Sequence, residues 1–111
     1  MESNRQMRII SGKFRGKSIN FLKNKITRPL KDSVKENIFN ILMHSKAINI
    51  KLEKSNILDL YSGVGSFGLE CLSRNAQFVT FVEKNLDALN VLKENVIKLS
   101  VKNQTEIIGY K

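Results

Sequence analysis

Residues 56–109 alternate between short apolar runs and helical patterns, and this alternation restricts the possible folds more than any other feature of the sequence. Three runs have the composition of strands: NILDL (56–60), which we expect to be buried, QFVTFV (77–82) and TEIIG (105–109). Helices are predicted between them at 66–75 and 85–101, the second with one buried face made of Leu89, Leu92, Val96 and Leu99. The order β-α-β-α-β implies a parallel sheet with right-handed crossovers.

The turn after the first of these strands contains three glycines spaced G-x-G-x-x-G, at Gly63, Gly65 and Gly68. Glycines at this spacing let the backbone approach a ligand closely, although the motif by itself is a weak indication. Its context strengthens it, because it follows a strand, opens a helix and precedes an acid, Glu83, at the end of the next strand. In an open α/β sheet this arrangement places a ligand across the carboxyl ends of the two strands. A turn that only lets helix and strand pack closely is the alternative.

The residues around the glycines distinguish between possible ligands. In dinucleotide-binding enzymes the first glycine normally follows the strand directly, whereas here Asp59 and three further residues come first. A carboxylate at a strand end repels a pyrophosphate but suits the ammonium and sulfonium groups of S-adenosylmethionine. Nothing matches the phosphate-binding pattern G-x-x-x-x-G-K-[ST]. We therefore predict S-adenosylmethionine in preference to NAD, with Glu83 holding two hydroxyls of its ribose.

The N-terminal half predicts a β-hairpin followed by a helix. MRIIS (7–11) and KSINFL (17–22) flank a basic tip, and Pro29 restricts the residue before it to an extended backbone. The helix is expected to start with a capping box formed by Ser33 and Glu36 and to end near His44–Ser45. Its expected apolar stripe consists of Val34, Ile38, Ile41 and Leu42, and Phe39 broadens it.

The whole excess of positive charge lies in the first half of the chain. The net charge is +9; residues 1–54 carry 13 Lys and Arg against 4 Asp and Glu, whereas residues 55–111 carry 6 of each. Such a one-sided excess favours a polyanionic partner, above all nucleic acid, over an ordinary solvated face. No apolar segment approaches the roughly 20 residues of a membrane span. The N-terminus has no apolar signal-peptide core, so we expect a cytoplasmic protein without a membrane partner.

The chain has one cysteine, Cys71, and one histidine, His44. A single cysteine excludes an internal disulfide, and the pair leaves too few soft ligands for a zinc site, so no metal is expected. Cys71 falls inside a predicted helix between two leucines, which favours a small buried side chain over a nucleophile.

Two stretches of the sequence together resemble a known family. The first is MRIISGKFRGKSI with TRPLKDSVKENIFNIL, and the second is ILDLYSGVGSFGLECLSRNAQFVTFVEKN. They are similar to the N-terminal hairpin, T-R-P segment and first helix, and to the first methyltransferase motif and its neighbour, of the RsmD-type 16S rRNA (guanine-N2)-methyltransferases. The resemblance extends from about Met7 to Lys111.

This resemblance implies a Rossmann-like class I S-adenosylmethionine-dependent methyltransferase fold of the α/β class, truncated after the third strand, with an N-terminal β-hairpin and helix. Residues 1–54 would be a basic RNA-facing extension, and 55–111 the first β-α-β-α-β half of the methyltransferase domain. The implied function is methylation of a guanine N2 in 16S ribosomal RNA, with that RNA or the small ribosomal subunit as partner. The cofactor-binding candidates are Asp59, Gly63, Gly65, Gly68 and Glu83, and the RNA-binding candidates are Arg8, Lys13, Arg15, Lys17 and Arg28.

The chain departs from the family in lacking its [N/D]-P-P-[Y/F] motif, since its one proline is Pro29. In the family, that motif holds the flipped amine in line with the methyl group and stacks on the base. We therefore expect an incomplete form with no catalytic residue and no turnover by itself, whose strand 56–60 leaves an apolar edge open to another chain. A non-catalytic RNA-binding or ribosome-assembly module is the alternative, while the spacing of Asp59 speaks against a fragment of a nucleotide-binding oxidoreductase.

Overall fold

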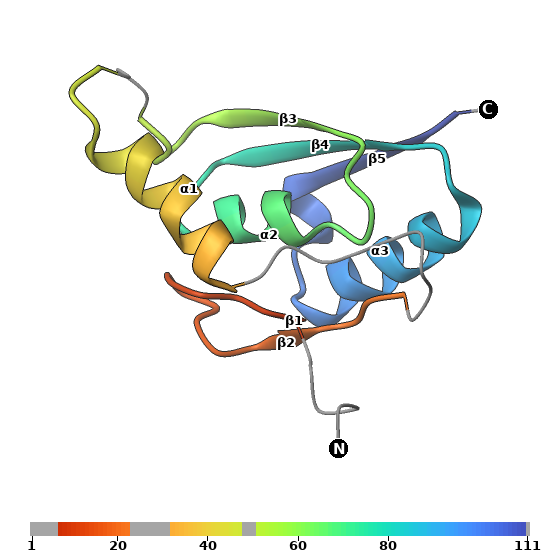
Figure 1. Cartoon of the computed structure of the whole chain (residues 1–111). Coiled ribbons are helices and arrows are strands. Elements are labelled where there is room, and N and C mark those ends of the chain that lie inside the picture. Colours follow the sequence, from red (N-terminus) through yellow and green to blue (C-terminus); the bar gives the residue numbers. More distant parts are fainter. Residues whose placement is uncertain (1–6, 23–31, 48–50, 111) are drawn as a thin grey trace.

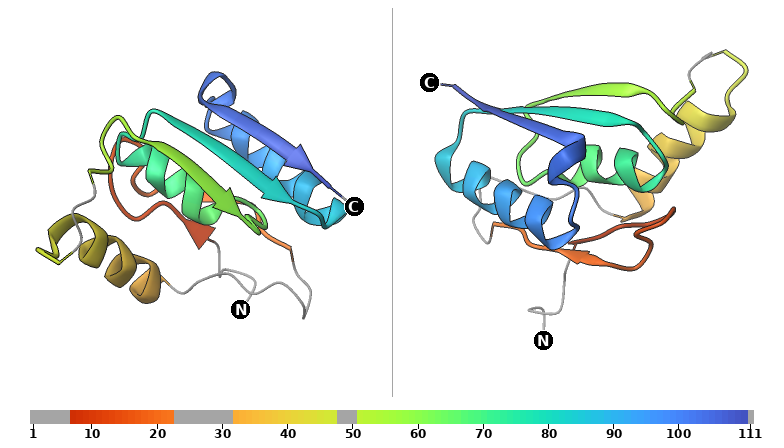
Figure 2. Two further views of the ribbon diagram at one scale, coloured as in Figure 1. Left: turned by 90° about the horizontal axis from the view of Figure 1, so that it is seen from above. Right: turned by 180° about the vertical axis from the view of Figure 1, so that it is seen from behind.

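The computed structural model describes residues 7–22, 32–47 and 51–110. They form three layers: a sheet, a layer of two helices beneath it, and a small hairpin on the far side of the helices (Figures 1 and 2). The elements are the hairpin strands β1 (Met7–Arg8) and β2 (Ser18–Ile19), helix α1 (Asp32–His44), strand β3 (Asn56–Leu60), helix α2 (Ser66–Ser73), strand β4 (Phe78–Glu83), helix α3 (Leu86–Lys98), the short 3₁₀ helix η2 (Lys102–Gln104) and strand β5 (Thr105–Gly109). The T-R-P segment, with the predicted RNA-binding residue Arg28, lies outside the described residues.

The sheet confirms the predicted parallel arrangement. Its order is β3-β4-β5, and both neighbouring pairs are parallel, with Asp59 opposite Phe81 and Val82 opposite Ile108. Helix α2 packs beneath β3 and β4, and α3 beneath β4 and β5 (Figure 1). Consecutive strands that are parallel neighbours require a crossover, and here each crossover is a helix on the same face of the sheet. None of the described helices is long and apolar enough to cross a membrane.

The prediction that NILDL forms a buried strand is wrong for every second residue. Leu58 and Leu60 are 62% and 56% exposed, whereas Ile57 packs against the core. Side chains alternate between the two faces of a strand, and among the described residues both helices cover the same face. In that part of the chain β3 is also an edge strand, as predicted.

Helix α3 buries the predicted face, because Leu89, Leu92, Val96 and Leu99 are all at most 8% exposed. Its first residue is Leu86, and the side chain of Asn85 caps it by accepting the Ala88 N–H at 2.9 Å. The predicted helix, 85–101, was therefore too long by a residue at the start and three at the end.

Helix α1 differs from its prediction in its start and in its buried face. It begins at Asp32, so Ser33 lies inside the first turn and the predicted capping box is wrong. The most buried residues are Lys35 and Phe39, while the predicted stripe residues Val34 and Ile41 are exposed. Phe39 stacks on Phe67 of α2, with ring centroids 4.9 Å apart. A lysine that is buried against a partner cannot be recognised from apolar periodicity alone.

One hydrophobic core joins both halves of the chain. Its buried residues from the first 54 positions are Met7, Ile9, Ile19, Phe39 and Leu52, and they pack with residues of α2, β4 and α3. The hairpin and α1 are therefore part of the folded unit, and a division at residues 54 and 55 stays a prediction.

Candidate functional site

The carboxyl ends of β3 and β4 bring the two predicted acidic residues to one edge of the sheet. Asp59 lies one residue before the end of β3, and Glu83 is the last residue of β4. The backbone N–H of Gly63 donates to Glu83 Oε1 at 2.7 Å, and that of Gly68 donates to Asp59 Oδ2 at 3.1 Å. The structure thus places Glu83 against the turn that follows β3, and Asp59 against the first part of the helix that follows this turn.

Residues 61–65 form this turn, which we name the glycine loop. Its backbone has positive φ at Tyr61 (57°), Gly63 (57°) and Gly65 (95°). The loop is tied to the neighbouring strand, because Ser62 N–H donates to the Val82 carbonyl at 3.0 Å. A tyrosine with positive φ is strained, and such strain is found most often at functional sites.

The three glycines of the motif have different surroundings. A methyl group added to Gly65 would lie 2.5 Å from Leu92 Cδ1, and one added to Gly68 would lie 2.4 Å from Phe81 Cε1. These two glycines therefore allow the loop and α2 to pack closely on α3 and β4. A methyl group added to Gly63 would meet no atom within 4 Å. Of the three, Gly63 is the one that borders open space, so a ligand can approach the loop backbone there.

The site has an unbalanced negative charge. Burial raises the pKa of Asp59 to about 6, against the lowering effect of its hydrogen bond from Gly68, and the nearby charge of Glu83 raises it further. A carboxylate in this setting gains from a cation that enters the site, since the cation offsets both desolvation and repulsion. The arrangement therefore favours a positively charged ligand group.

Glu83 is already engaged by the backbone. Its Oε1 accepts the Gly63 N–H, and its Oε2 accepts the N–H groups of Lys84 and Asn85 at 3.0 and 2.9 Å. A carboxylate has about four lone-pair positions, so Glu83 can accept one hydrogen bond besides these three. A grip on two ribose hydroxyls requires that one of these backbone N–H groups release its bond.

The predicted RNA-binding residues of the hairpin all face solvent. Arg8, Lys13, Arg15 and Lys17 are exposed, and the Lys13 and Lys17 ammonium groups lie 5.4 and 5.7 Å from the centre of the Phe14 ring. Arg8 and Arg15 also line a hollow between the hairpin and α1, together with Glu36. The hairpin thus presents these four cations, whereas α1 contributes the acidic Glu36 to the hollow. The hairpin lies on the side of the helix layer away from the sheet (Figure 1).

Sequence analysis missed a buried ionic cluster centred on Glu70. This fully buried carboxylate pairs with Lys35 at 3.2 Å and with Arg74 at 2.9 Å, and it accepts the backbone N–H groups of Ile10 and Ser11 at 2.9 and 3.0 Å. The i,i+4 spacing of Glu70 and Arg74 was a signal for their pairing. No sequence signal marks Lys35, because a lysine on an amphipathic helix normally faces water.

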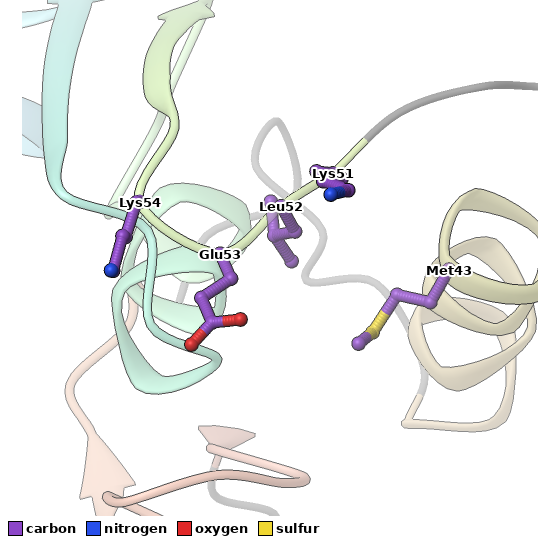
Figure 3. A pocket seen from close by; sticks show the side chains of 5 residues that line it. All are labelled: Met43, Lys51, Leu52, Glu53 and Lys54. Atoms are coloured by element: carbon purple, nitrogen blue, oxygen red, sulfur yellow. The ribbon is translucent and has the colours of Figure 1, made fainter.

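Two other features carry no part of the site. Cys71 is buried, as predicted, and its burial together with the charges of Asp59 and Glu70 raises its pKa to about 12, which makes it a poor nucleophile. Figure 3 shows a hollow lined by Met43 and residues 51–54. It lies before the start of β3, at the opposite end of that strand from the glycine loop. Within the described residues, no group of three or more His, Cys, Asp or Glu could hold a metal ion.

Comparison with known proteins places these features in a family. The model of the family described as Conserved hypothetical protein 95 matches residues 7–110. Ribosomal RNA small subunit methyltransferase D of Haemophilus influenzae is 39% identical over 105 residues, covering 94% of this chain and 51% of that protein. The protein of the same name from Escherichia coli K12 is 33% identical over 98 residues, covering 88% and 46%. The chain spans about half the length of the curated relatives it matches.

Solved structures give the same fold. The Escherichia coli protein yhhF superimposes with a TM-score of 0.77 at 28% identity, over 94% of this chain and 52% of its own. Protein HI0767 of Haemophilus influenzae has a TM-score of 0.69 at 34% identity, over 96% and 53%. The name of each includes methyltransferase or methylase. The predicted α/β architecture of the methyltransferase type is therefore confirmed.

Proposed function

The chain belongs to the family described as Conserved hypothetical protein 95, and from this membership we propose that it serves the transfer of a methyl group from S-adenosylmethionine to a guanine N2 of 16S ribosomal RNA. The described residues contribute a donor site at the glycine loop and a basic surface on the hairpin. The observation that carries the proposal is the bond of Gly63 to Glu83 at an open turn, with Asp59 bonded to Gly68 in the helix just after it. An RNA substrate in the ribosome would place this activity in the cytoplasm.

The residues at the glycine loop fit the proposed donor. Asp59, whose pKa is raised to about 6 by burial and by Glu83, would interact with the ammonium group of the methyl donor, which S-adenosylhomocysteine also carries. Gly63 leaves its backbone open to the ligand, and Glu83 can accept one further hydrogen bond, such as that from a ribose hydroxyl. When bound, S-adenosylmethionine supplies a methyl group on a positively charged sulfur. Gly65 and Gly68 would act by shaping the loop, because their missing side chains make room for Leu92 and Phe81.

The proposed RNA contact rests on charge and exposure. Arg8, Lys13, Arg15 and Lys17 are exposed on one hairpin, and a hollow of about 380 Å³ lies between that hairpin and α1. Cations on a rigid hairpin can follow a phosphate backbone, and each phosphate contact releases counterions. Glu36 at the same hollow would repel phosphates from its own position, so we expect Arg15 to be the phosphate ligand there.

Calorimetric titration of the chain with S-adenosylhomocysteine, and separately with NAD, tests the donor site. We expect saturable binding of S-adenosylhomocysteine and none of NAD. Asp59→Asn should weaken binding about tenfold or more, since it removes the negative charge. Glu106→Gln makes the same charge change at an exposed position on β5 and should leave binding unchanged. A cooperatively folded chain that does not bind S-adenosylhomocysteine would overturn the proposal and favour a non-catalytic RNA-binding module.

A filter-binding assay with a 16S ribosomal RNA fragment tests the RNA surface. Lys13→Ala with Lys17→Ala should weaken binding and lower the slope of log affinity against log salt by about 1 to 2. The matched control replaces two exposed lysines away from the hairpin, Lys93 and Lys102, and should leave both quantities close to wild type. Equal losses in the two double variants would show that binding follows net charge alone and not the hairpin.

A further inference from the structure

A buried asparagine connects the basic hairpin to the glycine loop. Asn95 lies on α3 and is fully buried. Its Nδ2 group donates to the carbonyl of Val64 in the glycine loop at 2.9 Å and to the carbonyl of Asn20 at 2.9 Å, while its Oδ1 accepts the Asn20 N–H at 2.7 Å. Asn20 directly follows hairpin strand β2. One side chain therefore holds two segments that are far apart in the sequence, and both of its amide protons are used.

A second link joins the N-terminal segment to the end of the same loop. Lys35 of α1 is also buried, and its Nζ donates to Ser66 Oγ at 3.2 Å and to the Arg8 carbonyl at 2.9 Å. Ser66 is the first residue of α2 and directly follows the glycine loop. The loop is thus held at Val64 and at Ser66 by groups that also hold the hairpin.

The two sides of the glycine loop therefore have different neighbours. Gly63 borders open space, where the proposed donor would approach. Val64 is 4% exposed, and its carbonyl points to Asn95 in the interior. Buried polar groups of this kind are costly to leave unpaired, so the loop and the segment at Asn20 move together or lose hydrogen bonds. A displacement or an immobilisation of the hairpin is in this way transmitted to the loop.

We propose that Asn95 is a positioning residue that couples the affinity of the hairpin for RNA to the affinity of the glycine loop for the methyl donor. This inference rests on the proposed function, since it needs both ligands. RNA that fixes the hairpin also fixes Asn20, Asn95 and Val64, so the donor then binds a loop that is already ordered. By linkage, the donor raises the affinity for RNA by the same factor.

The chain offers a matched control for this role. The side chain of Asn20 makes exposed hydrogen bonds with α3. Its Nδ2 donates to Glu94 Oε1 at 3.2 Å, and its Oδ1 accepts from Lys98 Nζ at 3.5 Å. Its bonds to Asn95 use the backbone. Asn20→Ala therefore removes the surface contacts of this side chain with α3, while the bond from Lys98 to Ser18 Oγ stays. It leaves the link to the loop intact, whereas Asn95→Ala removes the link.

The test measures the affinity for S-adenosylhomocysteine by calorimetry, without RNA and with a saturating 16S ribosomal RNA fragment. For the wild-type chain and for Asn20→Ala we expect RNA to tighten binding about fivefold or more. For Asn95→Ala we expect each ligand to bind alone, with a ratio close to one. If Asn95→Ala does not fold, Asn95→Leu serves instead, because it nearly keeps the side-chain volume and loses the amide donors.

The outcomes separate this inference from the proposed function. A wild-type chain that binds both ligands with no change in affinity would overturn the coupling and leave the proposed function standing. The coupling would also be overturned if the Asn95 variant kept the wild-type ratio, or if Asn20→Ala lost it equally. A folded chain that fails to bind one of the ligands alone would overturn the proposed function, and the coupling with it.

Discussion

Among single residues, a fully buried and a half-buried carboxylate of this chain have opposite surroundings. Glu70 accepts hydrogen bonds from two backbone N–H groups and pairs with Lys35 and Arg74. Asp59 accepts one backbone N–H and lies near the like charge of Glu83. The first carboxylate is compensated within the fold. The second is not, which is typical of a group kept for a ligand at a cost in stability.

Replacing Asp59 by asparagine should therefore stabilise the chain at neutral pH. The pKa of Asp59 is raised from 3.8 to about 6, so the stability that its protonated form contributes is fully present below about pH 4 and is lost as the pH rises through 6. Asp59→Asn keeps an acceptor for the Gly68 N–H without the charge. We expect a gain of about 2 kcal/mol in the free energy of unfolding at pH 7 and almost none at pH 4. Urea unfolding at both pH values measures this, and an equal gain at both would contradict it.

The same carboxylate makes donor binding depend on pH. A cationic ligand group prefers ionised Asp59, whose pKa is about 6 in the free site. The affinity for S-adenosylhomocysteine should therefore be about tenfold lower at pH 5 than at pH 7, as the ionised fraction falls. Calorimetry across this range gives the profile. Asp59→Asn should bind weakly at every pH, and a wild-type profile as flat as that of the variant would exclude Asp59 as the titrating group.

Some residues in and around the candidate site could be predicted from the sequence, and others could not, for a physical reason. Asp59 and Glu83 could be found because the carboxyl ends of neighbouring parallel strands meet at one edge. Lys35 and Asn95 could not, because their burial depends on partners, Glu70 and Val64, that lie at least 31 positions away in the sequence. Polar residues on helices are predicted to be exposed as long as their partners in the folded chain are not known.

At the scale of elements, the hairpin is docked on α2 mainly through backbone groups. Lys13 N–H donates to the Ser73 carbonyl at 2.9 Å, and Phe14 N–H donates to Ser73 Oγ at 2.9 Å. Gly12 makes this approach possible, since a methyl group there would lie 2.0 Å from the Ser73 carbonyl oxygen. This docking uses backbone groups and not the exposed side chains of Lys13, Arg15 and Lys17.

Substitutions at two glycines of the hairpin distinguish the stability that comes from this docking from the cost of backbone strain alone. Gly12 and Gly16 both have positive φ, 91° and 83°, but a methyl group on Gly16 would meet nothing within 4 Å. Gly16→Ala should therefore cost only about 1 to 2 kcal/mol for its backbone conformation. Gly12→Ala should cost about 3 kcal/mol or more, because the hairpin must also lift from Ser73 and lose hydrogen bonds. Urea unfolding of both variants measures these costs. Equal losses in the free energy of unfolding would mean that the close contact at Gly12 is relieved without undocking of the hairpin.

The prediction of α1 shows where element-level reasoning from sequence stops. Its existence and its end near His44 follow from propensity and pattern. Its orientation follows from one ionic contact, Lys35 to Glu70, and from the stacking of Phe39 on Phe67. Once Lys35 is drawn inward, Val34 and Ile41 turn to solvent. Apolar periodicity had included both in the buried stripe, although Leu42 of the same stripe does pack against the core.

For the whole molecule, the parallel sheet has one covered and one open face among the described residues (Figure 2). Leu58 and Leu60 on β3 and Ile108 on β5 are exposed, and Leu60, Val82 and Ile108 stand side by side in the register. In that part of the chain no strand pairs with the outer edge of β3. An apolar face beside an unpaired edge is a surface on which protein chains associate.

The isolated chain should therefore self-associate through this surface at high concentration. Leu58→Lys with Leu60→Lys should make it monomeric and leave its thermal midpoint nearly unchanged, because both side chains already face solvent. Ile57 directly precedes Leu58 on the same strand but packs against the core, so Ile57→Lys should lower the midpoint by several degrees, a loss of about 2 kcal/mol or more. Sedimentation and thermal unfolding measure the two effects separately. A wild-type chain that stays monomeric at every concentration would show that the open face is too small or too polar to drive association, since Thr80 and Glu106 interrupt it beside Leu58.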